Sequence, residues 1–182
     1  MVAWTQWIET YTEEDYEAFC NPKLINSYYG LPMQNLFSIA LNPDGLSNVK
    51  IRTTYFGTIW AYRYIKSKYS NAWMWDESYR FSLRSCQIQY NAQREFIRLM
   101  GEKRISDIES KALSLGLEPY KLGYKKPDVA VYCPGKRMKW LFFEVKRLDT
   151  GDTLSADQMK WLELLADSFG KKAVIELSLI QA

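Results

Sequence analysis

Asp128, Glu144 and Lys146 are residues whose types and spacing could do chemistry together. They stand in two apolar segments that are separated by the turn-like sequence 133–137, Cys-Pro-Gly-Lys-Arg. If the segments form a hairpin centred on Lys136, Asp128 lies directly opposite Glu144, with Cβ atoms ~5 Å apart. Lys146 then lies on the same face as Glu144, and the opposite faces are apolar and can be buried. The pattern predicts that two carboxylates and one amine converge on one patch.

The chemistry that such a patch offers is metal-assisted hydrolysis. Two carboxylates at this distance repel each other unless a proton or a cation lies between them, and a divalent ion removes the repulsion at neutral pH. A lysine beside the ion could hold or deprotonate a water, or stabilise charge on a phosphate. Phosphodiester hydrolysis needs these groups. The residues leave one alternative open, which is an ordinary cross-strand ion pair on a solvated face.

The composition restricts the chemistry further, because the 182 residues include no histidine. This excludes Ser-His-Asp and Cys-His hydrolases, HNH-type nucleases and every histidine-ligated metal site. Acid–base catalysis would fall to carboxylates, lysine or tyrosine, and a metal would be a hard ion such as Mg²⁺ or Mn²⁺. The three cysteines, Cys20, Cys86 and Cys133, are far apart and form no CxxC motif. We therefore expect reduced thiols and neither a zinc knuckle nor a disulfide framework.

The second half of the chain contains the elements that would position this patch. Apolar residues at helical spacing predict a helix that ends near Gly116, and they are Ile97, Ile105, Ile108, Ala112 and Leu115. Strands are predicted at 118–122, 127–133, 138–146 and 173–177. Residues 155–158, Ser-Ala-Asp-Gln, have the pattern of a capping box and predict a helix to about Phe169. The order α-β-β-β-α-β indicates an α/β (α+β) fold with a mixed sheet flanked by helices.

The first half of the chain contains weaker signals. Its predicted elements are a short helix capped by Thr12, a helix from Pro32 to Ala40, a turn at 42–45, a stretch at 50–69 that fits a helix or a strand equally, and a loop at 73–75. We therefore divide the chain in two. Residues 1–90 form a mainly helical N-terminal extension for substrate selection or dimerisation, and residues 91–182 form the core.

The candidate site residues also carry a resemblance to a known family. Asp128, preceded by a proline, and Glu144-Val145-Lys146 resemble the PD-(D/E)XK nuclease signature. The longer string of residues 127–132, 143–146 and 152–162 is similar to the virus-type replication-repair nuclease (VRR-NUC) domain. That domain forms the nuclease part of the Fanconi-associated nuclease and also occurs as small phage proteins. The resemblance covers about residues 91–182 and implies a restriction-endonuclease-like αβββαβ core.

The resemblance implies roles for individual residues. Asp128 and Glu144 would bind Mg²⁺ or Mn²⁺, and Lys146 would be the catalytic lysine. Gln158 would approach the site from its helix. The alternative for Gln158 is its role in the capping box, and both roles could coexist.

The match to the family has one ambiguous position and one departure. The family places a glutamate on the preceding helix, for which Glu102 fits the spacing better than Glu109, and the alternative for each is an ordinary solvated helix acid. The family also usually has Gly-Pro soon after its lysine. Here the segment 147–152 is slightly longer, which puts the loop beside the site in question rather than the metal ligands.

Basic residues around the predicted site indicate contacts to nucleic acid. They are Lys121, Lys125, Lys126, Lys136, Arg137, Lys139 and Arg147. Such bases contact phosphates without reading sequence. Bases also exceed acids in residues 49–88, where they are interleaved with Tyr55, Phe56, Trp60, Tyr62, Tyr64 and Tyr69. This mixture could stack bases and hold the nucleic-acid backbone, and the alternative is an aromatic core with a basic outer face.

Together these inferences predict a Mg²⁺-dependent DNA endonuclease that is structure-specific for junctions or flaps, of phage or repair type. The alternatives are a restriction-type endonuclease and a non-catalytic nucleic-acid-binding module that kept the nuclease fold. DNA is the expected partner, and a homodimer would suit the cutting of two strands. We expect a soluble cytoplasmic protein, in the host cell if phage-encoded. The sequence shows neither a signal peptide nor an apolar stretch long enough to span a bilayer.

Overall fold

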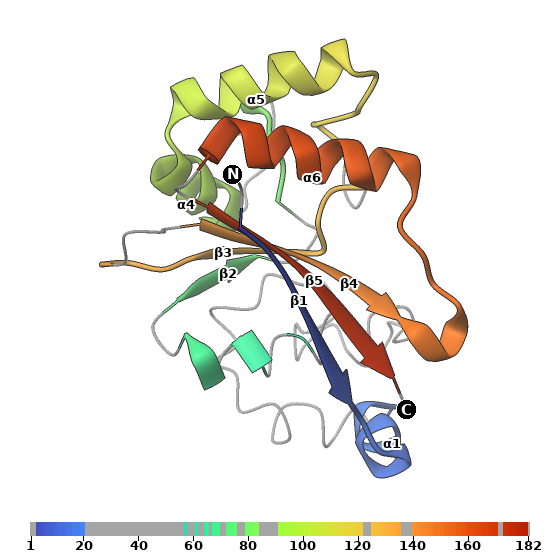
Figure 1. Ribbon diagram of the computed structural model, residues 1–182. Coiled ribbons are helices and arrows are strands. Elements are labelled where there is room, and N and C mark those ends of the chain that lie inside the picture. The colour runs from blue at the N-terminus through green and yellow to red at the C-terminus, as the bar shows by residue number, and fades with distance from the viewer. Residues whose placement is uncertain are drawn as a thin grey trace.

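The chain forms a five-stranded mixed sheet whose longer helices cover one face (Figure 1). The computed structural model describes residues 3–20, 57, 61, 64–65, 67–69, 72–75, 79–83, 91–121, 125–135, 140–170 and 173–181. The strands, in their order across the sheet, are β1 (Ala3–Thr10), β5 (Ala173–Gln181), β4 (Trp140–Arg147), β3 (Val129–Tyr132) and β2 (Trp73–Trp75). β5 is parallel to both β1 and β4, whereas the pairs β4–β3 and β3–β2 are antiparallel. The predicted mixed α/β class is confirmed at this level.

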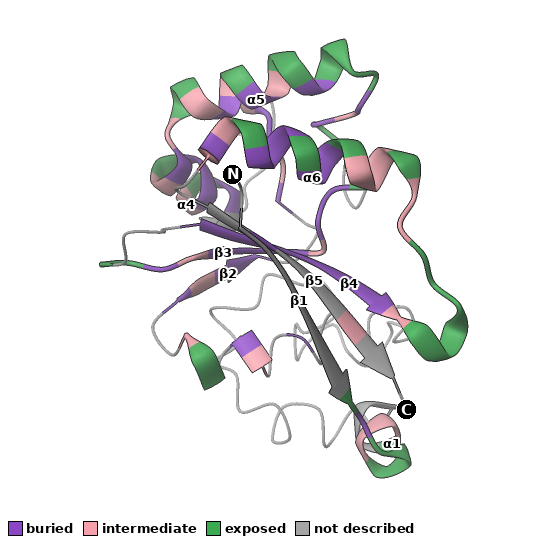
Figure 2. Ribbon diagram, in the orientation of Figure 1, coloured by how far each residue is buried: buried purple, intermediate pink, exposed green. Residues whose placement is uncertain are grey.

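The helices lie mainly over one face of this sheet. α4 (Asn91–Met100), α5 (Glu102–Ser114) and α6 (Ala156–Phe169) cover it, and α1 (Glu13–Cys20) follows β1 at the end of the sheet (Figure 1). A short 3-10 helix, η5 (Leu148–Thr150), follows β4 directly. Figure 2 shows β3 and β4 buried along most of their length, whereas α5 and α6 alternate between buried and exposed positions. The central strands are therefore enclosed, and the helices are amphipathic.

Aromatic side chains fill the space between the sheet and the helices. Phe81 lies against Trp161 of α6 and Phe142 of β4, with ring centroids 5.4 and 6.2 Å away. Phe96 of α4 contacts Trp140 of β4 edge-on, at 5.4 Å between centroids. Edge-on and offset contacts at these distances are the favourable arrangements for aromatic pairs. This aromatic core fixes the position of α6 relative to β4, which matters for the site described below.

The local capping signals are confirmed. The N–H of Asp15 donates to Oγ1 of Thr12 at 3.2 Å, and the N–H of Thr12 donates to Oδ2 of Asp15 at 2.9 Å, so the start of α1 is capped in both directions. Ser155 and Gln158 form the predicted capping box at the start of α6. The closing strand is also confirmed, because β5 contains the whole of the predicted 173–177.

One strand prediction and one loop prediction are wrong. Residues 118–122 were expected to be a strand, but residues 119–121 form a turn in which the N–H of Lys121 donates to the carbonyl of Glu118 at 3.2 Å. Pro119 has no N–H for a ladder, which favours the turn. Residues 73–75 were expected to be a loop and instead form β2, the third antiparallel strand. A run of three large apolar residues shows no alternation because two of the three, Met74 and Trp75, are buried on opposite faces of the strand.

The predicted single helix that ends near Gly116 is two helices. Gly101 separates α4 from α5 with φ 88°, a conformation that favours glycine. The stripe is otherwise buried as expected, at Ile97, Ile105, Ile108 and Ala112. Leu115 is the exception, because it lies beyond the last helical residue and is 44% exposed.

The described part of the first half is joined to the core. β1 and β2 are the two edge strands of the sheet, so the expected division at residue 90 does not bound the sheet. The predicted helix from Pro32 and the turn at 42–45 lie outside the described residues, as do most positions of 50–69. Among the described segments, no helix is long and apolar enough to cross a bilayer.

Candidate metal centre and active site

The hairpin of β3 and β4 has the predicted register. Val129 pairs with Phe143 and Ala130 with Phe142, so Asp128, just before β3, lies opposite Glu144. The N–H of Val145 donates to Oδ2 of Asp128 at 2.8 Å, which fixes this carboxylate against β4. The register follows from the turn, because a hairpin pairs residues symmetrically about its centre.

Burial on both faces of β4 is what the sequence did not predict. β4 lies in the middle of the sheet, and all of its residues except Arg147 are buried. Glu144 is 0% exposed and Lys146 is 6% exposed. The alternative of an ion pair on a solvated face is therefore wrong, because α6 covers the face that carries these two side chains.

The carboxylate of Glu144 is the centre of the cluster. Its Oε1 accepts from Nζ of Lys146 at 2.7 Å and from Nε2 of Gln158 at 2.5 Å. Its Oε2 is buried and has no hydrogen-bond partner among the described residues. A buried carboxylate oxygen without a donor is costly, so this atom marks a position where a proton or a cation would be stabilising.

Gln158 has both of the roles that the sequence left open. Its Oε1 accepts from the N–H of Ser155 at 2.9 Å, and its own N–H donates to Oγ of Ser155 at 3.3 Å, which completes the capping box. Its Nε2 is directed at Glu144. One side chain thus joins the start of α6 to the middle of β4.

Asp152 is a member of the cluster that the sequence did not single out. Its Oδ2 lies 3.5 Å from Nζ of Lys146, and its side chain is 46% exposed. It belongs to the segment between β4 and α6. Strand alternation could not place it, since the contact depends on how the chain turns after η5.

Burial shifts the protonation of both acids. It raises the pKa of Glu144 to about 9, and the nearby Asp128 carboxylate acts in the same direction, against the ammonium of Lys146. Burial also raises the pKa of Asp128 to about 6, although the Val145 N–H opposes this. For Lys146, burial lowers the pKa, but the neighbouring acids Glu144, Asp128 and Asp152 together raise it more, so the net shift is upward. Both acids are therefore harder to ionise than ordinary carboxylates, and a divalent cation bound to them would favour their ionised forms.

The donor set fits a hard divalent ion. Asp128 and Glu144 would supply two carboxylate oxygens. Within the described ranges, no group of three acidic or cysteine side chains comes together as a metal site, so the protein itself would supply few ligands. Mg²⁺ is commonly held by one or two protein carboxylates, with waters and substrate phosphates as the other ligands. The two acids and Lys146 are brought together as the sequence predicted.

Neither helix glutamate, Glu102 or Glu109, makes a hydrogen bond or ion pair with this cluster in the part of the chain that the structure describes. Glu102 is exposed on the first turn of α5, two residues from Arg104, whose guanidinium lies 4.8 Å from the ring centroid of Phe169. Phe169 ends α6, whereas Gln158 is in its first turn, roughly 16 Å away along the axis at 1.5 Å per residue. Glu109 is half-buried and accepts from the hydroxyl of Ser82 at 2.8 Å.

Several of the basic residues near the site are engaged within the protein. Lys126 is buried, and its Nζ donates to the carbonyl of Lys121 at 2.5 Å. Lys121 itself pairs with Glu118 at 2.6 Å. Lys125 is exposed. The predicted phosphate contacts Lys136, Arg137 and Lys139 lie outside the described residues.

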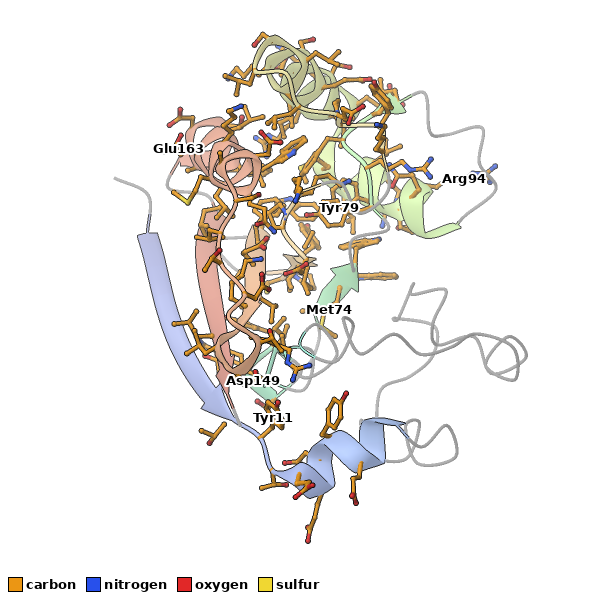
Figure 3. The ribbon with its side chains drawn as sticks, turned by 90° about the vertical axis from the view of Figure 1, so that its right-hand side faces the viewer. Tyr11, Met74, Tyr79, Arg94, Asp149 and Glu163 are labelled. Carbon is orange, nitrogen blue, oxygen red and sulfur yellow. The ribbon has the colours of Figure 1, made fainter. Side chains whose placement is uncertain are left out.

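Arg147 forms a second polar cluster just beyond the site. Its Nη2 donates to the hydroxyl of Tyr11 at 2.9 Å and to Oδ2 of Asp149 at 2.5 Å. The Tyr11 hydroxyl also donates to Asp149 at 2.8 Å, and Figure 3 shows the two side chains together. The guanidinium lies 5.7 Å from the ring centroids of Tyr11 and Tyr16. This cluster fastens the end of β4 to the segment between β1 and α1.

The described part of 49–88 is partly core and partly surface. Ala61 and Ile65 are buried, while Lys68 is exposed and lies over the rings of Tyr64 and Tyr69 at 5.1 and 5.6 Å. Tyr55, Phe56, Trp60 and Tyr62 lie outside the described residues.

Comparison of the chain with models of protein families, with curated proteins and with solved structures found no match.

Proposed function

We propose that the protein is a Mg²⁺- or Mn²⁺-dependent DNA endonuclease of the PD-(D/E)XK type. The observation that carries the proposal is the Glu144 carboxylate, which lies buried between Lys146 and Gln158 with one oxygen unpartnered. Asp128 is held opposite it. A purely structural ion pair would have its remaining lone pairs satisfied, and this one does not.

The connectivity around the site supports the same proposal. An antiparallel β3–β4 hairpin carries the acids and the lysine, α6 crosses over, and β5 returns parallel to β4. With α5 before the hairpin, this order corresponds to an αβββαβ core from its second strand onward, because the described residues 119–121 form a turn where the first strand was expected. We include the virus-type replication-repair subclass in the proposal because residues 152–162 supply the glutamine helix that contacts Glu144.

Each side chain would have a defined part in the reaction. Asp128 and Glu144 would hold the cation, which when bound would polarise the scissile phosphate and lower the pKa of a coordinated water. Lys146 would donate to the attacking water or to the phosphate oxygen on which charge develops. Gln158 orients Glu144 by its hydrogen bond. Asp128 stays in place because the Val145 N–H holds its second oxygen.

Cleavage assays test this proposal directly. Four-way junctions, flaps and linear duplex are incubated with the wild type and with Lys146→Met, in Mg²⁺, Mn²⁺ or EDTA. We expect cutting of junctions and flaps that EDTA abolishes, and a loss of roughly 100-fold or more in Lys146→Met, as for removal of one transition-state donor. Lys160→Met is the matched control, because Lys160 lies on α6, pairs with Asp157 at the surface and should not affect the rate.

Each other outcome changes the proposal in a defined way. Cutting that persists in EDTA contradicts the metal mechanism. Equal rates on all three substrates remove the structure-specific preference, which rests on the family resemblance. Cutting of duplex only at a defined sequence indicates a restriction-type enzyme. Binding of DNA without any cutting indicates a non-catalytic module. Sedimentation of the protein with a junction tests the proposed homodimer.

A further inference from the structure

Hydrogen bonds fix the main chain around Asp152, at the side of the cluster that faces solvent. Its N–H donates to the carbonyl of Arg147 at 3.1 Å, and the N–H of Gly151 donates to that of Leu148 at 3.2 Å. Gly151 has φ 69°, which lets the chain turn back toward β4. The capping box begins three residues later, at Ser155. The main chain is thus held on both sides of Asp152, and its carboxylate is directed at Lys146.

Lys146 has two acidic neighbours of different character. Glu144 is fully buried and 2.7 Å from the ammonium, whereas Asp152 is half-exposed and 3.5 Å from it. Among the described residues these are the acids that pair with Lys146. In the absence of a cation, the ammonium is therefore held mainly by Glu144, and Asp152 is a weaker second partner.

A divalent cation would compete with Lys146 for the same carboxylate. A cation at Oε2 of Glu144 would repel the ammonium at Oε1 and weaken its hydrogen bond. A buried ammonium without a counter-charge is costly. Asp152 is the acid within reach that could accept it, and this would keep Lys146 at the site rather than displace it.

We propose that Asp152 is a positioning residue that takes over the Lys146 ammonium when a divalent cation binds Glu144. The inference rests on the proposed function, because it assumes a cation on Glu144. The segment 147–152, which differs from the family pattern, would then serve to place Asp152 beside Lys146. Asp152 would thereby act on cation affinity through Lys146 and not as a ligand.

Calorimetric titration of the DNA-free protein with MnCl₂ tests this inference. We expect Asp152→Asn to bind Mn²⁺ roughly two- to tenfold more weakly than the wild type, as for loss of a half-exposed ion pair. Asp152→Glu should recover most of the affinity. Asp157→Asn is the matched control: it removes one carboxylate five residues away, in the first turn of α6, whose partner is Lys160.

A double-mutant cycle separates positioning from ligation. If Asp152 acts through Lys146, Asp152→Asn has no further effect on Mn²⁺ affinity when Lys146 is already replaced. Lys146→Met and Lys146→Gln are both used, so that the cycle does not depend on one replacement folding. An effect of Asp152→Asn that persists in both backgrounds means that Asp152 is itself a ligand and overturns the inference.

The remaining outcomes distinguish this inference from the proposed function. If the wild type binds Mn²⁺ and Asp152→Asn binds it equally well, the inference is wrong and the metal site stands. If the wild type does not bind Mn²⁺ at all, the metal premise of the proposed function fails, and the inference fails with it.

Discussion

The Glu144 carboxylate lies in a part of the protein that is otherwise largely apolar. Glu144 is buried in the central strand with one satisfied and one unsatisfied oxygen. Nearly every other large buried side chain is apolar or aromatic. Burial of such a group destabilises the ionised folded state, and carboxylates perturbed in this way are common at functional sites. The cost appears as a raised pKa, which makes it measurable.

The raised pKa of Glu144 predicts that stability falls as pH rises. Its folded-state value of about 9 lies above the ordinary 4.5, so the stabilisation is complete below the ordinary value and is lost as pH rises through about 9. Asp128 contributes in the same direction up to about pH 6. Thermal unfolding of the cation-free protein from pH 5 to 9 should show a steady decrease in Tm. Glu144→Gln, which cannot titrate, should flatten this dependence above pH 6.

The exposed Glu163 on α6 provides the control for this experiment. Glu163→Gln removes one carboxylate at the surface and should leave the slope of Tm against pH unchanged. Equal slopes for the wild type and Glu144→Gln would contradict the shifted pKa. Mn²⁺ should raise the Tm of the wild type most at the alkaline end, where Glu144 is ionised.

At the scale of elements, α6 and β4 are joined through one side chain. Gln158 belongs to the capping box of α6 and also donates to Glu144. A helix start is thereby linked to a strand interior by hydrogen bonds rather than by apolar contact alone. The aromatic contacts of Trp161 and Phe142 with Phe81 hold the same two elements together one turn further on.

Substitutions at Ser155 and Gln158 should separate the cap from the contact with Glu144. Ser155→Ala removes only the cap and should lower the free energy of unfolding by about 1 kcal/mol. Gln158→Ala removes the cap and the hydrogen bond to Glu144, and should cost about 0.5–1.5 kcal/mol more, as for loss of one intramolecular hydrogen bond. Urea unfolding at pH 8 measures both values. Equal losses would show that the Glu144 hydrogen bond contributes nothing to stability.

At the scale of the whole molecule, the two halves of the sequence share one sheet. β1 pairs with β5 along its full length, and β2 pairs with β3. The hydroxyl of Tyr79 donates to the carbonyl of Pro127 at 2.7 Å, directly before Asp128. Trp75, Tyr79 and Phe81 also belong to the core beneath the helices. The first half therefore contributes to the support of the site.

The fragment 91–182 should not fold on its own. It lacks β1 and β2, which exposes the edges of β5 and β3, and it lacks three aromatic residues of the core. We expect no cooperative thermal transition by circular dichroism, in contrast to the full chain. A cooperative transition in the fragment would instead support the division at residue 90.

What could be predicted from the sequence was local. The hairpin register depends on the turn between its strands, and the caps depend on residues three positions apart, so both are visible in a single segment. The edge strands depend on partners far away, as 73–75 does on β3 and 3–10 does on β5. The burial of Glu144 depends on the strand lying in the centre of the sheet, which alternation along one strand does not reveal. The contact between Asp152 and Lys146 depends on the conformation of the loop after η5.

The last two residues of β4 direct two cationic side chains to opposite faces of the sheet. Lys146 faces α6 and Glu144, while Arg147 faces Tyr11 and Asp149, because consecutive side chains of a strand alternate. A shift of β4 by one residue would exchange an ammonium for a planar guanidinium at the carboxylate and would detach α1 at the same time. Keeping Lys146 at the carboxylate and keeping α1 in contact with the end of β4 therefore require the same strand register. We expect homologous chains to differ in the length of their turns but to have no insertion or deletion of a single residue within β4.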